Sequence, residues 1–198
     1  DTIVRITADC PLIDPEVMDK VITTYLEFRH SIDYVSNSQI FTYPDGLDTE
    51  VIPFSTLECT WLYAKEQRHR EHIAPFIKNH KPFKKFNVEN DTDLSREAHR
   101  WVVDEPRDLE FVRKIYSKLE RHNYERPFGM KEVLELLSKE PELRDMNRGI
   151  ELNEGSYKSF TKEPPIPAQH RHLSLSNELK SRAGKVIPSY TQTFSKGP

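Results

Sequence analysis

One pattern occurs twice in this chain and restricts its fold more than any other feature of the sequence. A short apolar run is followed by an aspartate, and a proline then opens a stretch with helical spacing. The two copies cover residues 3–15 and 100–106, and their aspartates are Asp9 and Asp104. Short β-branched runs favour strands, and proline is favoured in the first turn of a helix. The pattern therefore predicts two strand–loop–helix units with an acidic side chain in each loop.

Apolar residues along the rest of the chain alternate between the same two kinds of spacing. Strand-like runs cover residues 3–6, 32–36, 47–53, 83–89 and 100–103, and helical spacing covers residues 16–29, 54–65, 71–79, 106–122 and 130–137. This alternation indicates an α/β domain built in layers. Open α/β sheets bind ligands beyond the carboxyl ends of their strands, so Asp9 and Asp104 are candidate site residues.

The composition argues against several classes of partner. The 198 residues suffice for one ordinary domain and an appendage, and the formal net charge of -3 provides no general attraction for nucleic acid or an anionic membrane. No run approaches the ~18 apolar residues of a transmembrane helix. Cys10 and Cys59 form neither a metal-binding spacing nor a disulfide framework, so we expect a reduced, cytoplasmic location.

The two aspartates have two interpretations that spacing alone leaves open. Carboxylates at neighbouring strand ends suit Mg²⁺, which binds one or two of them together with substrate phosphates. In that case we expect Asp9 and Asp104 to lie on the same side of the sheet, close enough to share one ion. An acidic residue before a helix that begins with proline is also a common N-cap, which requires no ligand.

Five segments, in sequence order, resemble the cytidylyltransferase family, and in particular its branch of spore coat polysaccharide proteins called SpsF. They are IVRITADCPLIDP at residues 3–15, YVSN at 34–37, YPDGLDTEV at 43–51, REHIAPFI at 70–77 and RWVVDEPRDL at 100–109. The CMP-sialic acid and CMP-KDO synthetases are relatives of this family. The resemblance implies a Rossmann-like nucleotide-diphospho-sugar transferase fold, in which helices flank a mostly parallel sheet.

The resemblance also implies a reaction and a cofactor. Members of the family transfer CMP from CTP to a sugar or sugar phosphate and release pyrophosphate, here for surface polysaccharide biosynthesis. By this resemblance Asp9 and Asp104 are the catalytic residues and the ligands of Mg²⁺. The family's first motif, a strand and a loop of the form RxxSxRLPGK that binds the nucleotide, has no counterpart in this sequence. We therefore expect an N-terminally truncated domain that is inactive alone.

Five further residues are candidates for binding the acceptor. Asp48 and Glu50 lie in a loop that faces the acceptor sugar in the family, where carboxylates accept hydrogen bonds from hydroxyl groups. Glu71 and His72, at the start of a predicted helix, would contact the acceptor or orient a catalytic group, and Asn37 at a strand end would bind substrate. Each also has a structural interpretation, as a residue of an ordinary turn, an acid near a helix N-terminus or a loop cap.

The chain changes in character after residue 148. We expect residues 1–148 to form the cytidylyltransferase-like domain and residues 149–175, which are polar and contain PPIP, to form a linker. Residues 176–198 weakly resemble the start of a glutamate-1-semialdehyde aminotransferase-type protein. This leaves open another function, that of a non-catalytic sugar-phosphate binding module fused to a PLP-dependent aminotransferase. A homodimer is also left open.

Overall fold

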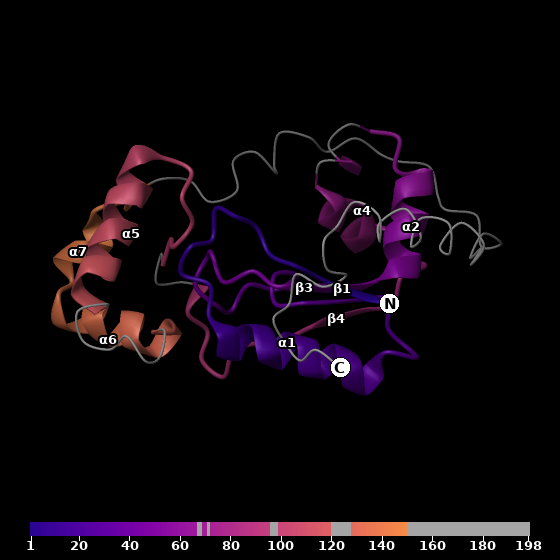
Figure 1. Cartoon of the computed structure of the whole chain (residues 1–198), viewed down its shortest axis with the longest axis horizontal. Coiled ribbons are helices and arrows are strands. Elements are labelled where there is room, and N and C mark those ends of the chain that lie inside the picture. Colours follow the sequence, from indigo (N-terminus) through magenta and orange to yellow (C-terminus); the bar gives the residue numbers. More distant parts are fainter. Residues whose placement is uncertain (67–68, 71, 96–98, 120–127, 150–198) are drawn as a thin grey trace.

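The computed structural model describes residues 1–66, 69–70, 72–95, 99–119 and 128–149. Within them a sheet separates α1 (Pro15–Phe28) on one face from α2 (Phe54–Tyr63) and α4 (Ile73–Asn79) on the other (Figure 1). Three further helices, α5 (Pro106–Leu119), α6 (Met130–Lys139) and α7 (Glu142–Asp145), lie together at one end of the molecule. The predicted α/β fold with flanking helices is confirmed.

The described sheet has four strands in the order β1-β3-β2-β4. The strands are β1 (Thr2–Arg5), β2 (Tyr34–Ser36), β3 (Glu50–Pro53) and β4 (Lys85–Asn87). β3 runs antiparallel to both β1 and β2, whereas β2 and β4 are parallel. Strands β1, β2 and β4 therefore point in the same direction, and β3 is the reversed strand that makes the sheet mixed.

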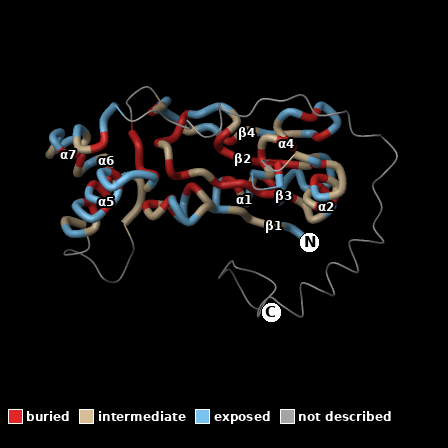
Figure 2. The backbone as a smooth tube through the Cα atoms, turned by 90° about the horizontal axis from the view of Figure 1, so that it is seen from above, coloured by how far each residue is buried: buried red, intermediate tan, exposed pale blue. Residues whose placement is uncertain are grey.

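The two faces of the sheet carry separate apolar clusters. Val51 of β3 packs with Val21 and Tyr25 of α1, while its neighbour Ile52 packs with Phe76 of α4. Alternate side chains of a strand point to opposite faces, which explains why adjacent residues join different clusters. The central strand β2 is buried along its length and β3 is buried except at Pro53, whereas the edge strand β1 is only partly covered (Figure 2).

Asp14 joins α1 to α6. Its Oδ1 accepts hydrogen bonds from the backbone N–H groups of Glu16 and Val17 at 2.6 and 3.3 Å, which makes it the N-cap of α1. Its Oδ2 accepts a hydrogen bond from the Met130 N–H at 2.5 Å, in the first turn of α6. A Cβ at Gly129 would lie 2.6 Å from this oxygen, so the contact requires the glycine. One buried carboxylate thus fixes the end helices against the helix that covers the sheet.

The prediction of a strand over residues 100–103 is wrong. This segment forms a single isolated bridge, between Arg100 and Asp45, and belongs to no strand of the sheet. Its backbone hydrogen bonds go to two loops instead: Trp101 donates to the Asp45 carbonyl at 2.7 Å, and Val103 donates to the Asp9 carbonyl at 2.8 Å. The helix predicted after it does begin at Pro106.

Several expectations lie outside the described residues. They concern Glu71, the linker from residue 150 onward and the aminotransferase-like segment at residues 176–198. In the part of the chain that the structure does describe, no helix combines the length and the apolar character needed to cross a membrane.

Candidate active site

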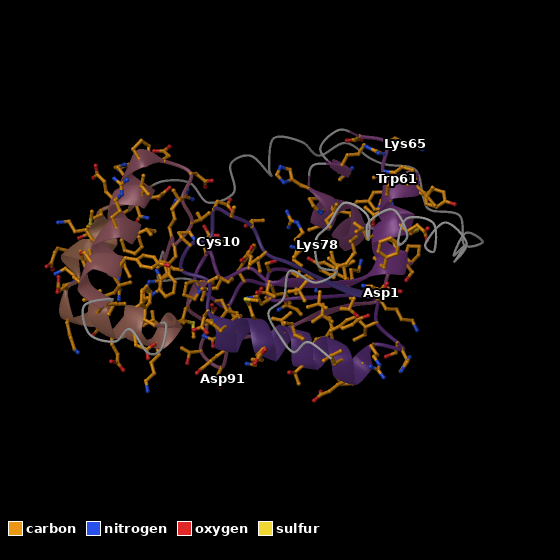
Figure 3. All side chains as sticks on the ribbon, viewed as in Figure 1. Asp1, Cys10, Trp61, Lys65, Lys78 and Asp91 are labelled. Atoms are coloured by element: carbon orange, nitrogen blue, oxygen red, sulfur yellow. The ribbon has the colours of Figure 1, made fainter. Side chains whose placement is uncertain are left out.

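The two loops that carry Asp9 and Asp104 lie side by side. The hydrogen bond from the Val103 N–H to the Asp9 carbonyl joins them directly, one residue before Asp104. Asp9 lies in a tight turn that is closed by a hydrogen bond from the Cys10 N–H to the Thr7 carbonyl at 3.2 Å. Figure 3 shows Cys10 on the loop between the end helices and the sheet. Both aspartate side chains are exposed.

Asp9 does not cap a helix. Asp14 performs that function, and among the described residues the Asp9 carboxylate receives only a long hydrogen bond of 3.7 Å from the Cys10 thiol. Burial, with a smaller contribution from Asp9, raises the pKa of this thiol to about 12, so it stays protonated near neutral pH. The Asp9 carboxylate therefore keeps its oxygens available for a ligand.

Asp104 does not use its side chain as a helix cap either. Asp108, one turn into α5, accepts hydrogen bonds from the backbone N–H groups of Asp104 and Glu105 at 3.1 and 2.9 Å. The Asp104 carboxylate instead accepts a hydrogen bond from Arg100 at 2.6 Å through Oδ2, and its side chain remains 56% exposed. Asp104 is thus an anchored but accessible carboxylate.

Asp45 is a third carboxylate beside these two, and the sequence did not single it out. Its side chain lies 3.9 Å from Arg100 and is largely buried. Burial raises the pKa of Asp45 to about 6; Arg100 opposes this shift, and the negative charges of Asp104 and Asp9 add to it. The three carboxylates therefore share one electrostatic environment, in which a cation would relieve repulsion.

Gly46 permits the close approach of the Asp45 loop to the segment before Asp104. Its φ of +103° lies in the region that favours glycine, and a Cβ there would be 2.7 Å from the Trp101 carbonyl carbon. The Asp45 N–H also donates to the His99 carbonyl at 2.9 Å. A larger residue at position 46 would push the two segments apart.

Asp48 and Glu50 occupy different environments, although both were predicted to face the acceptor. Glu50 is buried and accepts hydrogen bonds of 2.6 Å from both Arg5 and the Tyr34 hydroxyl, so each of its oxygens has a protein partner. Burial raises the pKa of Asp48 to about 7; Asp45 and Glu50 add to the shift, whereas Lys78 opposes it. Asp48 therefore exchanges a proton near neutral pH.

Lys78 of α4 is a cation on the Asp48 side that sequence reasoning missed. Its Nζ donates to the carbonyl and hydroxyl oxygens of Ser38 at 2.9 and 3.3 Å. Figure 3 shows Lys78 projecting from α4 on the side toward the Cys10 loop. Burial lowers its pKa, and the nearby Glu50 and Asp48 oppose that shift. No local pattern in the sequence distinguishes it from an ordinary helix-surface lysine.

Asn37 and His72 complete the predicted set. The side chain of Asn37 is buried, donates to the Leu47 carbonyl at 2.8 Å and accepts from the Thr49 N–H at 2.8 Å, so it fixes the loop that carries Asp48. His72 is exposed and occupies the N-cap position of α4 without a side-chain capping bond. Contact of either residue with a substrate stays a prediction.

Comparison with known proteins decides the family. Residues 1–128 match the family described as cytidylyltransferase. The chain belongs to the cytidylyltransferase family. It is 35% identical over 151 residues to Uncharacterized protein MJ1063 of Methanocaldococcus jannaschii, an alignment that covers 76% of this chain and 58% of that protein. It is 27% identical over 143 residues to Spore coat polysaccharide biosynthesis protein SpsF of Bacillus subtilis, covering 71% of this chain and 56% of SpsF.

A solved cytidylyltransferase from Leptospira borgpetersenii shares the fold of this chain. The two superpose with a TM-score of 0.68 and 29% sequence identity, and the match covers 77% of this chain and 61% of the other. The chain thus spans less than two thirds of the length of these relatives. The resemblance that the motifs indicated is confirmed.

The donor chemistry of this candidate site suits a hard divalent cation. Asp9 and Asp104 present exposed carboxylate oxygens on adjoining loops, and Mg²⁺ needs only one or two such ligands beside substrate phosphates and water. No group of three or more acidic, histidine or cysteine side chains within the described ranges could hold a metal by itself. A surface hollow of about 600 Å³ between α5 and α6 contains none of the predicted site residues in its lining.

Proposed function

We propose that the protein carrying this chain transfers CMP from CTP to a sugar or a sugar phosphate, releases pyrophosphate, and serves surface polysaccharide biosynthesis. Family membership and the similarity to SpsF support the reaction class. The observation that carries the proposal is the direct pairing of the Asp9 and Asp104 loops, which leaves two accessible carboxylates at one edge of the fold.

Asp9 and Asp104 would hold Mg²⁺ in this proposal. When bound, the ion neutralises charge on the triphosphate. The acceptor oxygen attacks the α-phosphorus in line, and where it belongs to a sugar hydroxyl its proton passes to water. A new phosphorus–oxygen bond forms, and the bond from the α-phosphorus to the oxygen that bridges it to the β-phosphorus breaks, so that pyrophosphate leaves. In this proposal the two side chains orient that ion: Arg100 holds the Asp104 carboxylate, and a closed turn holds the backbone that carries Asp9.

The acceptor would bind on the Asp48 side of the site. Asp48 is the carboxylate there that keeps no strong protein hydrogen bond among the described residues, so it is available to accept one from a sugar hydroxyl. Asn37 fixes the backbone on both sides of it. Glu50, Glu71 and His72 remain proposed acceptor-side residues, and the partners already held by Glu50 favour a supporting role for it.

Pyrophosphate release by the full-length protein tests this function. The assay contains Mg²⁺, CTP and a panel of sugars and sugar phosphates, and compares the wild type with Asp9→Asn and Asp104→Asn. Loss of a metal-binding carboxylate at a charged transition state costs roughly 100-fold or more in rate. Asp91→Asn is the matched control, because Asp91 is an exposed aspartate whose closest cation is Lys20 at 3.5 Å.

Two outcomes would contradict the proposal. Equal rates in the wild type and both site variants would remove Asp9 and Asp104 from the reaction. Absence of release with every nucleotide, from folded protein that still binds sugar phosphate, would favour the non-catalytic binding module fused to an aminotransferase.

A further inference from the structure

Arg100 contacts three carboxylates at once. Its Nε and Nη2 donate to the two oxygens of Asp108 at 3.0 Å each, in a two-pronged pair. The same Nη2 donates to Asp104 at 2.6 Å, and Nη1 lies 3.9 Å from Asp45. The arginine side chain is only 5% exposed. Its guanidinium therefore occupies the space between the start of α5 and the two acidic loops.

Asp108 forms the rigid base of this arrangement. It is completely buried and also accepts a hydrogen bond from Asn147 at 3.0 Å, in addition to the two backbone N–H groups at the start of α5. Asn147 donates as well to the Arg100 carbonyl at 2.9 Å. Both the position and the plane of the guanidinium are consequently fixed by groups that lie away from solvent.

The hydrogen bond from Arg100 to Asp104 is not needed for folding. Asp108 already neutralises the buried guanidinium of Arg100, and an ion pair with a carboxylate that is more than half exposed adds little to stability. The effect of this contact is on orientation. It holds Oδ2 of Asp104, and Oδ1 has no partner among the described residues.

We propose that Arg100 is a positioning residue that orients the Asp104 carboxylate for a divalent cation. The inference rests on the proposed function, because it takes Asp104 as a metal ligand. Partners that hydrogen-bond to metal-binding carboxylates fix their orientation, and loss of such a partner typically weakens metal binding 10- to 100-fold. Lysine cannot replace arginine here, because one ammonium cannot bond both oxygens of Asp108 and reach Asp104 in the same plane.

Binding of Mn²⁺ alone, followed by the electron paramagnetic resonance signal of the free ion, provides the test. We expect Arg100→Lys to raise the Mn²⁺ dissociation constant of the full-length protein about 10-fold or more. Val21→Ala in α1 is the matched control, because it removes buried apolar surface from the cluster between α1 and the sheet and takes no hydrogen bond from Arg100, Asp104 or Asp108. We expect it to lower the melting temperature and to leave the Mn²⁺ dissociation constant unchanged. Equal changes in the two variants would show a merely structural role and overturn the proposal.

A measurement on the wild type covers the case in which Arg100→Lys does not fold. In a nuclear magnetic resonance spectrum of the arginine side chains, substoichiometric Mn²⁺ should broaden the Arg100 Nε–H signal and leave that of the exposed Arg113 on α5 unchanged. Mn²⁺ binding without selective broadening at Arg100 would overturn the proposal.

The failure of the positioning role and the failure of the metal site give different results. If Asp104→Asn weakens Mn²⁺ binding and Arg100→Lys does not, only the positioning role fails. If neither Asp9→Asn nor Asp104→Asn weakens it, the metal site fails and the positioning role fails with it.

Discussion

Two carboxylate pairs in this molecule have the same residue chemistry and different surroundings. Asp9 and Asp104 are exposed, and a guanidinium holds one of them. Asp48 and Glu50 are less exposed: Glu50 is buried in a hydrogen-bonded ion pair, and Asp48 is half-buried, with its pKa raised by burial to about 7. Exposure leaves the oxygens of a carboxylate accessible to a cation, whereas burial raises the pKa of a carboxyl group. The comparison explains how one part of the fold would provide both the proposed metal site and the proposed acceptor side.

The largest effect on stability is expected where the ion pair between Glu50 and Arg5 is broken. Glu50→Gln removes the charge that Arg5 and the Tyr34 hydroxyl contact, and we expect it to lower the free energy of unfolding by about 2–3 kcal/mol in urea titrations. Glu110→Gln on the exposed surface of α5 is the control and should change it by less than about 0.5 kcal/mol. Similar values for the two variants would mean that Glu50 is not a structural anchor.

A smaller effect concerns the pH dependence of stability. Because the pKa of Asp48 is raised from 3.8 to about 7, the folded protein binds a proton that the unfolded chain has released, and stability falls as pH rises through this window. Asp48→Asn removes this ionisation. The free energy of unfolding of the variant should therefore fall less than that of the wild type between pH 4 and pH 7, by about 1–2 kcal/mol after allowance for solvent screening.

Asp19→Asn, on the exposed side of α1, is the control for this measurement and should leave the slope unchanged. Urea titrations at several pH values provide the slopes. A wild type that gains stability between pH 5 and pH 7, with no difference in Asp48→Asn, would contradict the assignment of a raised pKa to Asp48.

The smallest expected effect is that of the Lys78 charge on the pKa of Asp48. Lys78 lowers the pKa of Asp48, so Lys78→Gln should raise that pKa further. Nuclear magnetic resonance titration of the Asp48 carboxyl carbon measures this shift, with Lys131→Gln on α6 as the exposed control. A downward shift would show that Lys78 is not close enough to act on Asp48.

The sequence predicted those helices and strands that local apolar spacing or a proline specifies. Apolar spacing located α1 and β1, and proline located the start of α5. Residues 100–103 resembled a strand because they are apolar, but their backbone partners are the loops at Asp9 and Asp45, and no local pattern specifies such partners. The N-cap of α1 at Asp14 was not predicted, although its place directly before Pro15 at the start of a helix is the signal for it.

The candidate site was predictable to the extent that motifs mark it. The family motifs identified Asp9, Asp104 and the loop with Asp48. The roles of Asp45 and Lys78 depend on how far folding buries them, and burial arises from elements that are distant in sequence. Arg100 is a mixed case: Asp104 and Asp108 lie four and eight residues after it, and only Asp45 comes from a part of the sequence that is distant.

The glycine at position 46 has a consequence for motion. Because a Cβ at this position would lie 2.7 Å from the Trp101 backbone, and because hydrogen bonds tie Asp45 to residues 99 and 101, this loop is held close against the segment before Asp104. The bond from Val103 to Asp9 connects the third loop to the other two. We therefore expect any movement of the site around a ligand to come from elements outside these three loops.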